Sequence, residues 1–212
     1  MVRVFVSLIA FFGACGAAIA HPHVFIDSQS RLIFGAEKTL SAVAHKWVFD
    51  EAFSAFAVQG LDENRDGIYT REELVELAQV NVDSLAEFDF FTFLDLGETP
   101  IDFTTPIDYW LDHDGSRLTL NFTLPLADPI NLDGRTAQIQ VFDPTIFVAF
   151  FMDQEKAATI EGAIDGCRSI YEGVEERDID ASTNFTDDFL ASLDAVDEFA
   201  AQFAEVVKIS CT

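Results

Sequence analysis

The feature that most limits the fold of this chain is a series of short β-rich runs separated by turn signals. Such runs recur over residues 88–94, 101–103, 107–111, 118–124, 137–142 and 146–152. The pairs Asp114-Gly115 and Asp133-Gly134 lie between them and are typical of hairpin turns. The pattern predicts an antiparallel β-sheet or sandwich, completed by a last strand over 206–211.

The exported part of the chain is expected to open with a β-hairpin. Apolar residues over 24–34 and 40–48 predict two antiparallel strands, with residues 35–38 as the turn. At Asp50 the spacing of apolar residues changes to that of a helix, and helical spacing returns after a polar loop. Residues from about 50 to 87 therefore form a predicted helix-loop-helix insertion, which makes the fold class α+β.

The polar loop, residues 62–73, matches the twelve-residue calcium loop of an EF-hand. Gly67 stands at the sixth position, where the backbone turns sharply. The residues at the ligand offsets are Asp62, Asn64, Asp66, Ile68 (through its carbonyl), Thr70 and Glu73. Their oxygens suit a hard cation, so the sequence predicts a Ca²⁺ site. The alternative is that Asp, Asn and Gly form only an ordinary turn.

The expected role of calcium is structural. Sensors of this class usually pair two such loops and expose a Met-rich groove. This chain has a single loop and two methionines, and removal of Met1 leaves only Met152. Calcium is therefore expected to brace the fold.

The first twenty residues are typical of a signal peptide. One basic residue, Arg3, precedes an apolar run that ends in Ala18-Ile19-Ala20. The run is shorter than a membrane-spanning helix requires, and no later segment is apolar enough to span a membrane. We expect cleavage before His21 and export of a single domain, residues 21–212. Lipid attachment at Cys15 is the rival interpretation.

Export leaves two cysteines, Cys167 and Cys211, which we expect to form a disulfide in an oxidising compartment. Two free buried thiols are the alternative. Between them, apolar residues recur at helical spacing from Thr186 to Val206 and predict a C-terminal amphipathic helix. Its acidic outer face is interpreted as solvated surface.

Three of the four histidines fall within the predicted hairpin. After cleavage, His21 would combine a free amine with an imidazole, and His23 and His45 could supply further nitrogen ligands. Nickel, cobalt, zinc and copper accept such ligands. The simpler reading is a solvated terminus and an ordinary strand histidine.

The charge of the chain limits its partners. It holds 37 Asp and Glu against 12 Lys and Arg, a formal charge of −25. Nucleic acid and anionic membranes are therefore poor partners, and divalent cations are favoured. Gly-rich phosphate loops, His-Glu-x-x-His and Gly-x-Ser-x-Gly are missing from the sequence, so we expect no enzymatic activity.

Four motifs together resemble a family of exported bacterial proteins of unknown function. They are the segments that begin at His21 (HPHVFID), Trp47 (WVFDEAFS), Asn81 (NxxSLxEFDFFT) and Val141 (VFDPT). Such proteins are often described as the periplasmic component of an uncharacterised ABC-type transport system. The resemblance implies a periplasmic location near a nickel, cobalt or zinc transporter of the inner membrane, and it brings no catalytic residues.

Taken together, these observations predict a periplasmic, calcium-binding accessory or solute-binding component of divalent-metal transport. One alternative is a calcium-braced structural module that docks a partner and has no transport role. Another is a copper-binding oxidoreductase that uses His21.

Overall fold

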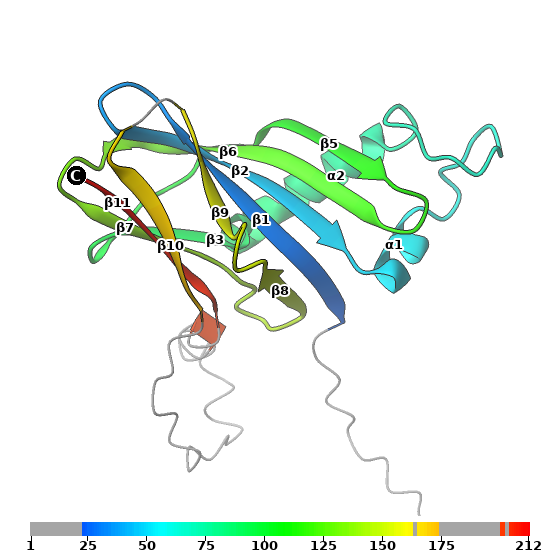
Figure 1. The fold of residues 1–212 in the computed structure, drawn as a ribbon. Helices are drawn as coiled ribbons and strands as arrows, with labels where there is room; N and C mark the ends of the chain where they lie inside the picture. Colours follow the sequence, from blue (N-terminus) through cyan, green and yellow to red (C-terminus); the bar gives the residue numbers. More distant parts are fainter. Residues whose placement is uncertain (1–22, 163–164, 174–199, 202–203) are drawn as a thin grey trace, which may run out of the picture.

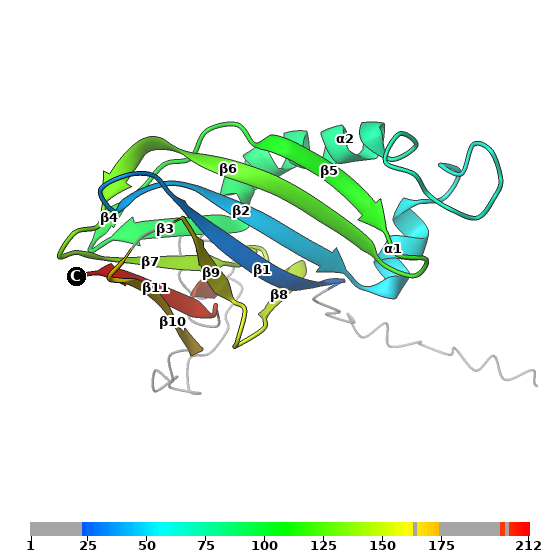
Figure 2. The ribbon, with the colours of Figure 1, turned by 45° about the horizontal axis from the view of Figure 1, so that its top comes forward.

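Two β-sheets and two short α-helices make up the structure, a computed structural model that describes residues 23–162, 165–173, 200–201 and 204–212. The sheets pack against each other, and Figure 2 shows them as two layers. Strands dominate, so the fold is the β-rich form of the predicted α+β class.

The larger sheet has six strands in the order β5-β6-β2-β1-β8, with β9 also paired to β1 (Figure 1). The bounds are β1 Val24–Phe34, β2 Thr39–Phe49, β5 Ile107–His113, β6 Leu118–Asn131, β8 Val148–Met152 and β9 Ala158–Glu161. Strands β1 and β2 pair antiparallel, with Ser28 opposite Trp47 and Ser30 opposite His45. The predicted hairpin is therefore confirmed.

The prediction of a purely antiparallel sheet is wrong at one edge. Strands β8 and β9 both run parallel to β1. Alternation of apolar and polar residues indicates a strand but not its direction, which depends on how the chain crosses back. Strand β9 and strand β10, Cys167–Gly173, were not predicted.

The smaller sheet is antiparallel throughout, in the order β10-β11-β7-β3-β4. Its other strands are β3 Thr92–Leu96, β4 Thr99–Pro100, β7 Thr136–Val141 and β11 Val206–Cys211. The last strand is confirmed, and so is the disulfide, because Cys167 lies opposite Cys211 in the β10–β11 register.

Two helices lie in the segment of about 50–87 where helical spacing was predicted. Helix α1 spans Glu51–Ala57, α2 spans Val75–Leu85, and a 3₁₀ segment, η1, follows at Ala86–Phe91. The predicted EF-hand-like helix-loop-helix is not formed, because α1 ends before the loop at Ala57 and α2 starts only at Val75. The strand predicted from residue 88 begins only at Thr92, because Asp89 and Phe90 have φ angles of 50° and 55°. Such left-handed residues break a strand.

The core lies between the sheets and under α2. Along β1, buried residues alternate with exposed ones, as expected for a strand with one face on the core. Trp47 is almost fully buried, and its ring meets the edges of Phe122 and Phe150 at centroid distances of 4.8 and 4.9 Å. Each fully buried large apolar side chain contributes about 2 kcal/mol to stability.

Some predictions fall outside the described residues. They are the signal peptide of residues 1–20, the His21 ligand and nearly all of the C-terminal helix predicted from Thr186. In the part of the chain that the structure describes, no helix is long and apolar enough to cross a membrane.

Candidate functional site

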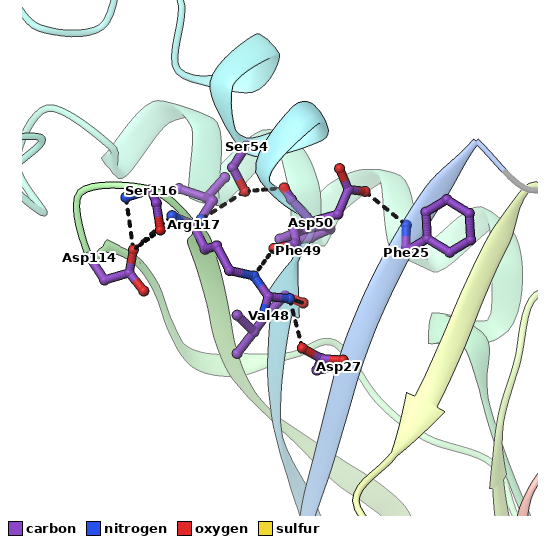
Figure 3. A network of polar contacts seen from close by, with 10 residues as sticks. Phe25, Asp27, Val48, Phe49, Asp50, Ser54, Asp114, Ser116 and Arg117 are labelled. Carbon is purple, nitrogen blue, oxygen red and sulfur yellow. Dashed lines mark hydrogen bonds and ion pairs between the residues drawn. The ribbon is translucent and has the colours of Figure 1, made fainter.

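Helix α1 starts where β2 ends, at Asp50. One carboxylate oxygen of Asp50 accepts a hydrogen bond from the Phe53 backbone N–H at 2.9 Å and so caps the helix. The other oxygen accepts from the Phe25 N–H at 3.0 Å (Figure 3). One side chain therefore ties the start of α1 to the edge of β1.

Arg117 and Ser54 complete this junction (Figure 3). The Arg117 guanidinium donates to the carbonyls of Phe49 and Val48 at 2.7 and 3.0 Å, and it pairs with Asp27 at 2.8 Å. The buried Ser54 hydroxyl donates to the Asp50 carbonyl and accepts from the Leu118 N–H. These bonds fix α1 against the ends of β1, β2 and β6.

The predicted calcium loop, residues 62–73, follows α1 and projects from one end of the molecule (Figure 1). Asp62 accepts hydrogen bonds from the backbone N–H groups of Asp66 and Gly67 at 3.1 and 3.0 Å. Asn64 also accepts from the Asp66 N–H, at 2.8 Å. Gly67 has a φ angle of 81°, a left-handed conformation that glycine adopts without steric strain, and this explains the glycine at the sixth position.

Glu73 closes the loop. One of its oxygens accepts from the Glu63 N–H at 3.1 Å, and the other accepts from the Thr70 N–H and hydroxyl at 2.9 and 3.0 Å. The hydrogen bond from the Thr70 backbone is the main reason that the pKa of Glu73 lies below its ordinary value. The twelfth position is therefore joined to the second, and its carboxylate is held ionised.

The second half of the loop is attached to β5. Arg71 forms a two-pronged ion pair with Asp112 at 2.6 and 3.0 Å, and its guanidinium lies 4.9 Å from the ring centre of Trp110. Tyr69 packs edge-on against His113, with ring centres 4.8 Å apart. The loop is therefore docked on the sheet.

The ionisation of Asp112 reflects this docking. Partial burial acts to raise its pKa, but hydrogen bonds from Arg71 and Trp110 and the charges of Arg71 and Lys46 lower it overall. Sequence analysis missed this anchor. The sequence pattern that could have identified it is the two-residue alternation of a strand, which places Trp110 and Asp112 on one face.

The loop has the expected backbone turn, but its carboxylates are not gathered around a common point. Among the residues described, no group of three or more His, Cys, Asp or Glu side chains is arranged to hold a metal ion. The oxygens of Asp62 and Glu73 instead accept backbone hydrogen bonds. Calcium binding at residues 62–73 stays a prediction.

The structure separates the histidines that were predicted to share a transition-metal site. His23 is exposed just before β1, with its ring 4.9 Å from that of Phe147. His45 lies opposite Ser30, seven residues further along β1, a span of roughly 20 Å in an extended strand. The structure therefore does not bring His45 and His23 together.

His45 is instead a buried core residue. Its two ring nitrogens lie 3.2 Å from the hydroxyls of Ser30 and Thr92, so both hydrogen-bonding positions are filled. Burial lowers its pKa from 6.5 to about 3. The ring is neutral at physiological pH and joins β1 and β2 of one sheet to β3 of the other.

Comparison with known proteins extends over nearly the whole chain. A family model described as "Protein of unknown function (DUF1007)" matches residues 6–211. An uncharacterized protein from Haemophilus influenzae is 27% identical over 197 residues, which cover 91% of this chain and 92% of the relative. Neither description names a ligand or an activity.

Proposed function

The chain belongs to the DUF1007 family of proteins of unknown function, and we propose that it is an exported calcium-binding protein. In this proposal, Ca²⁺ is held by Asp62, Asn64, Asp66, the carbonyl of Ile68, Thr70 and Glu73. The observation that carries it is the closed turn in which Glu73 bonds back to Glu63, next to Asp62.

The negative charge of the loop favours the binding of a cation. Residues 62–73 contain five carboxylates, from Asp62, Glu63, Asp66, Glu72 and Glu73, against two arginines. Mutual repulsion disfavours the closed turn, and a divalent ion would relieve it. A small movement of the carboxylates away from the backbone N–H groups would let them face the ion.

The expected effect of calcium is to brace one end of the domain. Helix α1 is tied to the sheet through Asp50, and the far side of the loop is tied to β5 through the Arg71–Asp112 pair. An ion within the loop would link these two attachments. Single extracellular sites of this kind bind with dissociation constants of about 10⁻⁴ to 10⁻³ M.

Calorimetric titration of calcium into the wild type and two matched variants tests this proposal. Glu73→Gln removes the twelfth-position carboxylate, whereas Glu72→Gln makes the same change at its exposed neighbour, which is not at a ligand offset. Glu73→Gln should weaken binding at least tenfold, and Glu72→Gln should change it less than threefold. The proposal fails if wild type shows no saturable site at millimolar calcium, or if both variants bind alike.

A second part of the proposal is a role in handling nickel, cobalt, zinc or copper, and it rests on the predicted cleavage before His21. In a chain cut before His21, the terminal amine and the imidazoles of His21 and His23 would supply nitrogen ligands. His45 is omitted because it is buried and already hydrogen-bonded. Delivery of this metal to an inner-membrane transporter in the periplasm is the role that the family resemblance implies.

Metal titration of the cleaved protein tests this second part separately. A chain that begins at His21 should bind nickel or copper more tightly than the same chain with an added N-terminal Met, whose amide blocks the His21 amine. His21→Ala with His23→Ala should abolish that binding and leave calcium binding unchanged. Equal binding by all three proteins would remove the transition-metal role without affecting the calcium site.

A further inference from the structure

A hollow of about 300 Å³ lies on the face of the six-stranded sheet that is turned away from the core. Ala44 on β2 forms its floor, in register with Arg31 on β1 and Thr123 on β6. Trp110 on β5 and Lys156, just before β9, lie on its two sides. Because Ala44 is small, the longer side chains around it leave a space above the sheet.

The charges around the hollow are opposite to those of the chain as a whole. Three cationic side chains line it, from Arg31, Lys46 and Lys156, against the single carboxylate of Asp108. In the complete sequence, acidic residues outnumber basic ones by 37 to 12. The hollow is therefore a local positive site on a strongly negative protein, which focuses attraction for an anion.

Two of these cations, Lys46 and Lys156, have charge available for a ligand, whereas the third, Arg31, is already paired. Arg31 pairs through its Nε with Glu161 at 2.7 Å. Within the described part of the chain, the ammonium groups of Lys46 and Lys156 have no carboxylate within ion-pair distance. Both residues are exposed, so an anion in the hollow can reach them from solvent.

Trp110 gives the hollow a rigid planar wall. Its indole N–H donates to Asp112 at 2.7 Å, and the Arg71 guanidinium lies over its ring. These two contacts hold the ring in a fixed position. An aromatic or flat apolar group can therefore pack beside it at little cost in side-chain entropy.

We propose that this hollow, lined by Arg31, Lys46, Lys156 and Trp110, is a binding site for a small organic anion with a planar apolar part. Lys46 and Lys156 would contact its carboxylate or phosphate oxygens, and its planar part would lie against Trp110. The volume is at the lower end of the range for small-molecule sites. The hollow shares no lining residue with the predicted calcium loop, and its one link to that loop described here is the contact of Arg71 with Trp110.

Calorimetry with phenyl phosphate and benzoate tests the proposal, with phenol as the neutral probe. At least one of the two anions should saturate a single site on the full chain, whereas phenol should not. Binding of phenyl phosphate alone would assign the site to phosphate ligands, and binding of benzoate would assign it to carboxylates. The affinity should fall as salt is added, because screening weakens the attraction.

Matched variants locate the site. Lys46→Gln with Lys156→Gln should weaken binding at least tenfold, and Ala44→Leu, which fills the floor, should abolish it. Lys208→Gln removes a lysine paired with Glu172 on the other sheet and should change binding less than twofold. The proposal is overturned if neither anion saturates, or if the double variant, shown to be folded by circular dichroism, binds as wild type does.

Discussion

The loop of residues 62–73 contains every residue predicted to bind calcium, whereas the buried centre around His45 contains only one of the three histidines predicted to bind a transition metal. In the loop, every hydrogen bond that shapes the turn joins residues no more than ten positions apart. At the centre, His45 bonds to Ser30, fifteen residues away, and to Thr92, forty-seven residues away. One arrangement is local and exposed, and the other joins two sheets and is buried.

This difference shows when a residue pattern can be read as a site. Side chains within a short loop stay near one another in any fold that preserves the turn, so their offsets carry information about ligands. A histidine in a strand faces either solvent or the core, and the choice depends on distant segments. His45 faces the core, where its hydrogen bonds make it structural.

The largest expected effect comes from removing the buried ring. His45→Ala should lower the free energy of unfolding by about 3 kcal/mol, because it leaves a cavity, removes the partner of the buried Ser30 hydroxyl and leaves the Thr92 hydroxyl with only its bond to the Phe90 carbonyl. His23→Ala, at an exposed position, should lower it by less than about 0.5 kcal/mol. Urea unfolding measures both. Similar losses for the two variants would show that His45 contributes no more to stability than an exposed histidine.

Acid should destabilise the protein through the same residue. The folded-state pKa of His45 is lowered to about 3, so the unfolded chain, with a pKa near 6.5, takes up a proton first as pH falls. The contribution of His45 to the free energy of unfolding should be fully present above pH 6.5. At pH 5 the free energy of unfolding should be lower by roughly 2 kcal/mol. Urea unfolding between pH 7 and 5 measures the slope.

A matched variant isolates this contribution. His45→Phe combined with Ser30→Ala and Thr92→Val removes the titrating group together with the hydroxyls that would lose their partner. Its stability should change little between pH 7 and 5. A variant that keeps the slope of the wild type would assign the acid sensitivity to other groups.

A smaller effect is expected from two glycines with positive φ. Gly67 in the loop and Gly115 in the β5–β6 turn have φ angles of 81° and 102°, and an added Cβ would meet no atom within 4 Å at either position. Alanine at either site should therefore cost about 1 kcal/mol through backbone strain alone. Thermal unfolding in chelator measures this cost.

Of these two glycines, only the one in the loop should affect the affinity for calcium. Gly67→Ala should weaken calcium binding, because it distorts the turn between the ligand positions, whereas Gly115→Ala should leave it unchanged. Calorimetric titration of both variants separates the two outcomes. Equal calcium affinities would show that the loop turn does not organise an ion site.

The smallest effect concerns the docking of the loop. Arg71→Gln breaks the ion pair with Asp112, but both side chains are about half exposed, so stability should fall by less than about 1 kcal/mol. The same change should increase hydrogen exchange in residues 68–73. Unchanged exchange would show that the loop keeps its position without this contact.

Sequence patterns predicted the local parts of the fold well. The β1–β2 hairpin and the last strand are confirmed. The Cys167–Cys211 disulfide is also confirmed, but it joins distant residues and was predicted from the number of cysteines. Patterns failed at residues 88–91, where four successive residues with three Phe resemble a strand but form a 3₁₀ segment with left-handed residues. Phe91 is buried there against Trp47, a contact that short-range propensity does not contain.

By itself, the sequence determined the features that depend on neighbours along the chain: the alternation of β1, the Asp50 cap and the glycine turn of residues 62–73. Only the tertiary structure decided the parallel pairing of β8 and β9, the burial of His45 and the cationic hollow above Ala44. The physical reason is that strand direction, side-chain burial and local charge depend on which distant segments of the chain pack together. Backbone propensity does not specify those tertiary contacts.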